Sequence, residues 1–183
     1  FGIADLGLPN FNLTSAGIAR VGWDDSSITG VTLADNTVLF EICFDEVGGN
    51  STNANVEFSG NPIAIEVVNA QGQILNATFN EGTVSVDCGM MDGEDGNTDN
   101  GEGTGDGDTG ADDGNMATDL TFSASQVTAN CGEQVCVDVT AAGFANVLSF
   151  QYSMNWDANL LGTASVQNFG ITDMDASQFN VLN

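Results

Sequence analysis

Residues 37–44, TVLFEICF, carry an apolar side chain at every second position from Val38 to Phe44. Successive side chains of a β-strand face opposite sides of its sheet, so this alternation predicts a strand with one buried face. The same period recurs in residues 133–140, EQVCVDVT, and in residues 148–156, LSFQYSMNW. Shorter alternating runs and turn residues fill most of the remaining sequence, and no stretch keeps a helical period. We therefore predict an all-β protein, an antiparallel jelly-roll or Ig-like β-sandwich.

An acidic segment separates two groups of predicted strands. Residues 92–115 read DGEDGNTDNGEGTGDGDTGADDGN and contain no large apolar side chain. Such a sequence cannot bury enough surface to offset its ordering entropy, so residues 92–116 are interpreted as an acidic Gly/Asp-rich linker.

The end of the sequence repeats its beginning. Residues 169–183, FGITDMDASQFNVLN, align without a gap on residues 1–15, FGIADLGLPNFNLTS, at an offset of 168 positions. Six of the fifteen positions are identical, and the apolar spacing is kept. This indicates an internal repeat with a period of 168 residues.

The repeat suggests how the strands are divided among domains. Residues 1–91 are interpreted as the C-terminal part of one sandwich, and residues 117–183 as the N-terminal part of the next. We expect the two segments not to pack together within one chain, but each to complete its sandwich with strands of a neighbouring copy, either covalently continuous or strand-exchanged.

The charge of the chain limits its partners. There are 26 acidic residues, one arginine, no lysine and no histidine, for a net charge of −25. Nucleic acids and anionic membranes are bound through Lys and Arg, so neither is an expected partner. No apolar run is long enough to span a membrane. Cations are the natural counterparts of this chain.

Four sequence features resemble the cohesin-like domains of bacterial surface proteins. They are the turn from Trp156 to Leu160, a Gly-led strand with an aromatic-Asp ending at residues 17–24, the hairpin strand at residues 39–44, and the closing strand GTVSV at residues 82–86. The resemblance implies a nine-stranded jelly roll. Such domains serve as dockerin receptors, as carbohydrate binders and as spacers.

The cysteines favour an oxidising, extracellular setting. The resemblance implies that the strands of Cys43 and Cys136 are neighbours, as are those of Cys88 and Cys131, which suggests two disulfides. In a repeated array each of these bridges would join neighbouring copies. A local Cys131–Cys136 loop, with Cys43 and Cys88 left over or joined, is the alternative, and the spacing alone does not decide between them.

Catalysis finds little support, since a chain without histidine or lysine lacks the usual general bases. A glycosidase needs two carboxylates, which Asp24, Asp25 and Asp157 could supply, but an Asp at a strand end is more often a turn former. Trp23 and Trp156 could form a sugar platform, although their alternating positions favour the core. We expect no enzymatic activity.

Calcium is the candidate ligand of the acidic segment. Residues 106–114, DGDTGADDG, place four carboxylates among glycines and faintly resemble the Asp-Gly loops of thrombospondin type-3 repeats. These carboxylates, which suit hard cations, belong to Asp106, Asp108, Asp112 and Asp113. A solvated acidic spacer explains the same residues equally well. Three N-x-S/T sequons, at Asn12, Asn50 and Asn76, are available for glycans.

Together these features predict a structural subunit of an extracellular filament or surface stalk, in which copies of the sandwich are joined head to tail. The alternatives are a cohesin-like binding module for a dockerin or a carbohydrate, and an adhesin repeat stiffened by calcium.

Overall fold

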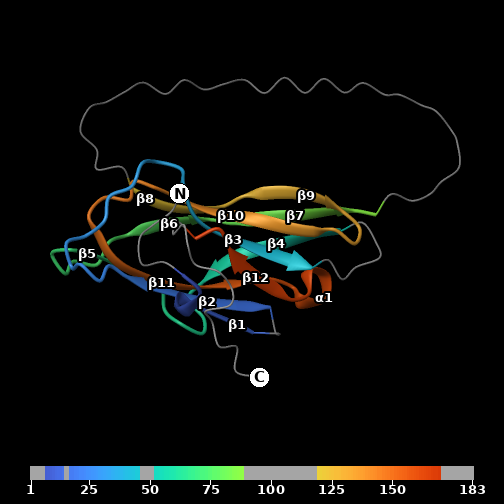
Figure 1. The fold of residues 1–183 in the computed structure, drawn as a ribbon, viewed down its shortest axis with the longest axis horizontal. Coiled ribbons are helices and arrows are strands. Elements are labelled where there is room, and N and C mark those ends of the chain that lie inside the picture. Colours follow the sequence, from blue (N-terminus) through green and yellow to red (C-terminus); the bar gives the residue numbers. More distant parts are fainter. Residues whose placement is uncertain (1–6, 15–16, 46–51, 89–118, 170–183) are drawn as a thin grey trace, which may run out of the picture.

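The computed structural model describes residues 7–14, 17–45, 52–88 and 119–169. These residues form two packed β-sheets with very little helix (Figure 1). The elements are η1 (Leu8–Asn10), β1 (Phe11–Thr14), β2 (Ile18–Asp24), β3 (Thr37–Asp45), β4 (Thr52–Ser59), β5 (Glu66–Asn69), β6 (Ala77–Asn80), β7 (Gly82–Asp87), β8 (Leu120–Ala124), β9 (Gln126–Asn130), β10 (Gln134–Ala142), β11 (Val147–Asn155), α1 (Ala158–Leu161) and β12 (Ala164–Gln167). The predicted all-β sandwich is confirmed.

The two sheets differ in size. The larger has the order β1-β2-β11-β4-β7-β9, with β5 also paired to β11, and the smaller has the order β12-β3-β10-β8-β6. Most pairs are antiparallel, as predicted, but β6 with β8 and β7 with β9 are parallel. A parallel pair needs a long connection, and residues 81–119 and 88–125 supply these two.

The number of strands exceeds the nine implied by the resemblance to cohesin-like domains. One cause is visible at Ser125, where the run from Leu120 to Asn130 leaves the smaller sheet as β8 and enters the larger sheet as β9. The backbone N–H of Ser125 donates to the carbonyl of Asp138, and the N–H of Asp138 donates to the Ser125 hydroxyl. These bonds satisfy backbone groups where the strand crosses between sheets.

Both sheets contain strands from both sides of the acidic segment, paired directly with one another. In the larger sheet β11 lies between β2 and β4, and in the smaller sheet β3 lies between β12 and β10. The register of β3 with β10 places Ile42 opposite Val137. The expectation that the segments before and after the linker do not pack together within one chain is therefore wrong for this structure. The alternating pattern specifies which strands pair and which faces are buried, but a strand of the same chain fulfils it as well as a strand of a neighbouring copy.

The core lies between the sheets and is rich in aromatic side chains. Tyr152 packs against Phe58, Phe79, Phe122 and Phe150, with ring centroids between 5.2 and 5.8 Å apart. Tyr152 is fully buried, and its hydroxyl has no hydrogen-bond partner within the described part of the chain. Burial raises the pKa of this phenol far above its usual range, so it stays protonated.

Candidate functional sites

The first site is the disulfide that joins β3 to β10. Cys43 lies opposite Cys136 in the antiparallel register, and the two are bonded although 93 positions separate them in the sequence. The second disulfide joins Cys88, directly after β7, to Cys131, directly after β9. The two disulfides thus join cysteines of neighbouring strands, and the local Cys131–Cys136 loop is not formed. Both bonds lie within one chain, unlike the bonds between copies that an array predicts.

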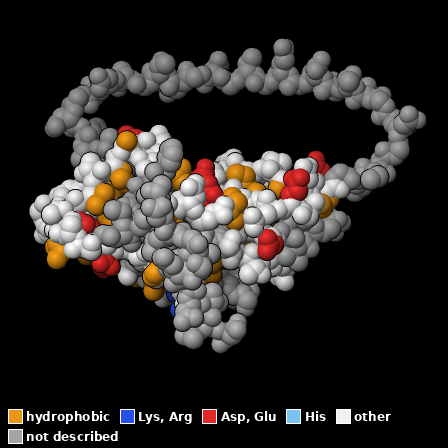
Figure 2. Space-filling view, in the orientation of Figure 1, with side chains coloured by type: hydrophobic (Ala, Val, Ile, Leu, Met, Phe, Trp, Pro, Cys, Tyr) orange, Lys and Arg blue, Asp and Glu red, His pale blue; other side chains and the backbone are white. Residues whose placement is uncertain are grey.

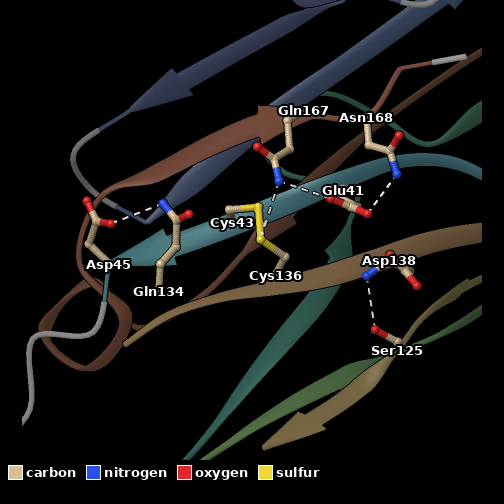
Figure 3. The surroundings of a disulfide bond; sticks show 9 residues. All are labelled: Glu41, Cys43, Asp45, Ser125, Gln134, Cys136, Asp138, Gln167 and Asn168. Atoms are coloured by element: carbon tan, nitrogen blue, oxygen red, sulfur yellow. Dashed lines mark hydrogen bonds between the residues drawn. A yellow bond between two sulfur atoms is a disulfide. The ribbon is translucent and has the colours of Figure 1, made fainter. Parts of the chain in front are cut away.

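Polar side chains surround the Cys43–Cys136 bond on the outer face of the smaller sheet (Figure 3). The carboxylate of Glu41 accepts hydrogen bonds from Nε2 of Gln167 at 3.1 Å and from Nδ2 of Asn168 at 2.7 Å. Nε2 of Gln167 also lies 3.6 Å from Sγ of Cys136. These contacts connect β12 to β3 and β10, so this group of side chains stabilises the sheet.

The same group is a poor metal site. Glu41, Cys43 and Cys136 place possible ligand atoms within 4.8 Å of one another. The two sulfurs are bonded to each other, however, and metals bind cysteine as the thiolate. Nearby, loss of hydration raises the pKa of Asp138, and the negative charge of Glu41 raises it further. This arrangement disfavours charge at Asp138.

A second cluster of polar contacts surrounds Asp25, directly after β2. The side chain is buried, and its carboxylate accepts hydrogen bonds from the hydroxyl and N–H of Ser27 and from the N–H groups of Thr29 and Gly30, at 2.7 to 3.1 Å. The Ser27 hydroxyl bond contributes most to a lowered pKa of Asp25; loss of hydration opposes it, and the backbone donors add to the lowering. The carboxylate thus organises the loop, within which Ile28 has a φ of 59° and is 72% exposed.

The other carboxylates considered for a glycosidase pair also lie at strand ends. Asp157 caps α1 and accepts hydrogen bonds from the N–H and Nδ2 of Asn159, at 2.9 and 3.0 Å. Asp24 is exposed at the end of β2. Asp25 and Asp157 therefore act as the turn formers that the sequence favours.

The tryptophans do not form an exposed aromatic surface. Trp23 is 2% exposed and packs against Phe150, and Trp156 is 6% exposed and packs against Phe44. Nε1 of Trp156 donates to the carbonyl of Gly162 at 3.2 Å. Both rings belong to the core, so neither supplies a platform for a sugar ring.

An open pocket of about 330 Å³ lies on the larger sheet, over β2, β5 and β11. Its polar lining includes Asp24, Glu66, Ser149 and Gln151. Gly22 also lines the pocket, and a Cβ built there would meet nothing within 4 Å. Sequence analysis missed this site. The available signal was a glycine within an alternating strand, which often marks a place where another molecule approaches the backbone.

The remaining candidate residues are placed only in part. Asn12 and Asn76 are exposed, on β1 and directly before β6, whereas Asn50 lies outside the described residues. The predicted calcium ligands, Asp106, Asp108, Asp112 and Asp113, also lie outside them. On the face shown in Figure 2, acidic side chains are scattered rather than gathered into one patch.

Comparisons with known proteins do not identify the chain. No protein-family model matches it, and no curated protein or solved structure matches it significantly. The resemblance to cohesin-like domains stays a prediction. Within the described residues, no helix has the length and apolar character needed to cross a membrane.

Proposed function

We propose that this chain is a structural subunit of an extracellular filament or surface stalk, built from β-sandwiches joined head to tail. The observation that carries the proposal is the agreement between the sequence repeat and the fold. The repeat has a period of 168 residues, and the strands of the described residues run from Phe11 to Gln167. One period is thus long enough to hold these strands, which is the relation expected of a repeated structural unit.

The disulfides and the charge support an extracellular location. Two disulfides formed within one domain suit an oxidising compartment. A net charge of −25 keeps separate molecules apart at low ionic strength. Filament formation is therefore expected to require salt or divalent cations, since either screens that repulsion.

The strand pairing supports a different position for the acidic segment in such a filament. Strands from both sides of the segment pair with one another, which favours a place for it within one sandwich, whereas the sequence alone suggests a linker between successive sandwiches. We then expect the contact between subunits to come from the sandwich itself or from residues before β1 or after β12.

Electron microscopy tests the proposal directly. The purified chain, concentrated in 150 mM salt with and without calcium, is expected to form filaments with an axial repeat of one sandwich. Sedimentation velocity over the same concentrations should show a concentration-dependent increase in size. The filament would be contradicted if the chain is a monomer under all these conditions and is also a monomer at the surface of the cells that produce it.

The pocket over Gly22 favours a second candidate, a binding module for a carbohydrate. Substituting Gly22→Val places a side chain in the pocket, where the added Cβ meets nothing within 4 Å. If the pocket binds a sugar, this variant loses binding on a glycan array while its melting temperature is kept. An exposed substitution away from the pocket, Thr78→Val on β6, is the matched control. Absence of any glycan bound by the native chain would contradict this candidate.

A further inference from the structure

The outer face of β2 carries three exposed residues of different character. Arg20, Gly22 and Asp24 are exposed. Val21 and Trp23, which alternate with them, are buried in the core. Since alternate side chains of a strand share one face, the three exposed positions face the same way. This face of β2 therefore presents, in succession, a cation, a position without a side chain and a carboxylate.

The positive charge on this face is separate from the pocket over Gly22. The carboxylates of the pocket belong to Asp24 and Glu66, and Arg20 does not line it. Arg20 and Asp24 are four positions apart, which is about 13 Å along an extended strand. Arg20 is also the only Lys or Arg of the chain. No other basic side chain of the same molecule can therefore enter the pocket.

The pattern on β2 is complementary to itself. A two-fold rotation about an axis that passes over Gly22, parallel to the sheet and perpendicular to the strand, lays the β2 of a second copy antiparallel to the first. Arg20 of each copy then lies over Asp24 of the other, and the two Gly22 residues meet at the axis. Contacts of this kind, in which one patch binds the same patch of a second copy, are the commonest in homodimers.

Gly22 is the position at which the two faces come closest. It is not among the glycines with a positive φ, and a Cβ built on it would meet nothing within 4 Å. Neither the backbone nor the packing of its own chain therefore requires glycine here. Glycine inside a strand weakens the strand, and it often marks a place where another backbone approaches closely. The backbone of a second copy explains this glycine.

We propose that two copies of this chain associate through the outer face of β2, with the Arg20 guanidinium of each copy bound in the pocket of the other, beside Asp24 and Glu66. This inference does not rest on the proposed filament, because a two-fold contact closes after two copies and cannot extend a row. It would join two subunits side by side. The contact also occupies the pocket of the carbohydrate candidate, so the dimer excludes a sugar from it.

The charge of the chain makes this association dependent on salt. Two molecules that each carry a net charge of −25 repel one another at low ionic strength. At 0.15 M salt the screening length is about 8 Å, so the repulsion between distant charges is reduced more than the attraction within an ion pair in contact. Dimers are therefore expected at high protein concentration near physiological salt, and fewer of them at low salt.

Complementary charge variants of the full chain test the contact. Arg20→Glu leaves two carboxylates on the face, and Asp24→Arg leaves two guanidinium groups. Each variant alone places like charges opposite one another and should be a monomer by sedimentation equilibrium in 150 mM salt, at concentrations where the native chain dimerises. Mixed in equal amounts, the two should form a heterodimer, because every carboxylate of one variant then faces an arginine of the other.

Two further variants serve as controls. Arg20→Asp with Asp24→Arg in one chain exchanges the two charges, keeps the self-complementary pattern and should dimerise alone. Glu81→Arg makes the same charge change as Asp24→Arg at an exposed position between β6 and β7, and should dimerise like the native chain. Melting temperatures close to that of the native chain show that the exposed substitutions leave the fold intact.

The outcomes separate this inference from the proposed function. A heterodimer of two variants that are each monomeric supports the contact, even if no filament is seen. A native chain that stays monomeric at all concentrations, or an Arg20→Glu variant that dimerises as well as the native chain, overturns it. Equal loss of dimer in Glu81→Arg also overturns it, because overall charge would then control association. Filaments formed by Arg20→Glu leave the proposed filament standing.

Discussion

Cys88 and Cys131 are bonded to each other from the two sides of the acidic segment, so the chain between β7 and β9 forms a closed covalent loop. The Cys43–Cys136 bond also joins a strand before the segment to a strand after it. The sandwich is consequently held together across the segment by two covalent bonds and by strand pairing in both sheets.

This arrangement predicts that the sandwich survives a cut in the acidic segment. A recognition sequence for a specific protease inserted between Asp106 and Gly107 should be cleaved without loss of the β-sheet circular dichroism signal. The two fragments should run together on a denaturing gel without reductant and separate when reductant is added.

The uncut chain carrying the same insertion is the control for this experiment. Fragments that separate without reductant would show that the disulfides do not cross the segment. Multimers held by Cys43 and Cys136 would instead indicate bonds between copies.

The Asp25 loop predicts a dependence of stability on pH. The pKa of Asp25 is lowered in the folded chain, so its contribution to stability is present above the unfolded pKa of about 3.9. It is lost as the pH falls through the folded pKa. Substituting Asp25→Asn should lower the midpoint of urea unfolding at pH 7, and the difference from the native chain should shrink below about pH 4.

Asp24→Asn is the matched control, since Asp24 is exposed and one position away. It should change the midpoint little at either pH. An Asp25→Asn variant that loses the same stability at pH 3 as at pH 7 would show that the carboxylate charge is not what organises the loop.

Removing the buried hydroxyl of Tyr152 should leave the stability of the chain unchanged or increase it. Its hydroxyl is buried without a hydrogen-bond partner among the described residues, and an unpaired buried hydroxyl costs about 1–3 kcal/mol. Tyr152→Phe keeps the aromatic contacts and should leave the free energy of unfolding unchanged or raise it by about 1 kcal/mol. Tyr152→Ala should lower it by about 3–5 kcal/mol, because it leaves a cavity. Urea unfolding of both variants measures these values, and a large loss in Tyr152→Phe would reveal a partner for the hydroxyl.

The acidic segment predicts binding of a divalent cation. If Asp106, Asp108, Asp112 and Asp113 bind calcium, titration calorimetry should show saturable binding that a chelator reverses. Changing all four residues to Asn should abolish it. Changing Asp92, Asp95 and Asp99 to Asn removes similar charge elsewhere in the segment and should retain binding. Equal loss in both variants would indicate a diffuse counterion atmosphere.

The sequence was informative about strands and less so about their assembly. The alternation at Val38–Phe44 correctly predicts β3 and the burial of Phe40, Ile42 and Phe44, because alternate side chains of a strand share one face. The prediction of a single buried face is incomplete, since Leu39 and Cys43 are buried too. The alternation does not indicate whether the partner strand comes from the same chain or from a neighbouring copy, since the contacts are the same in both. Closure of the sandwich within one chain therefore could not be derived from the alternation.

The candidate sites also differ in how far they could be predicted from the sequence. The turn-forming role of Asp157 follows from its local sequence, and the structure has it as the cap of α1. The pocket over Gly22 is formed by three strands that are distant in sequence, so the glycine within β2 is a local signal but does not show which other strands line the pocket. Local chemistry could be predicted here, whereas features assembled from several strands could not.

The Cys43–Cys136 bond has a mechanical consequence for a chain under tension. Force applied to residues before β3 and after β10 passes directly through this bond and bypasses the residues between the two cysteines. Only the flanking strands, among them β1, β2, β11 and β12, can be pulled out, whereas the intervening loop keeps its length until the bond is reduced. Each sandwich would then stretch by a limited amount and stop, which makes the redox state of its surroundings a control on its extensibility.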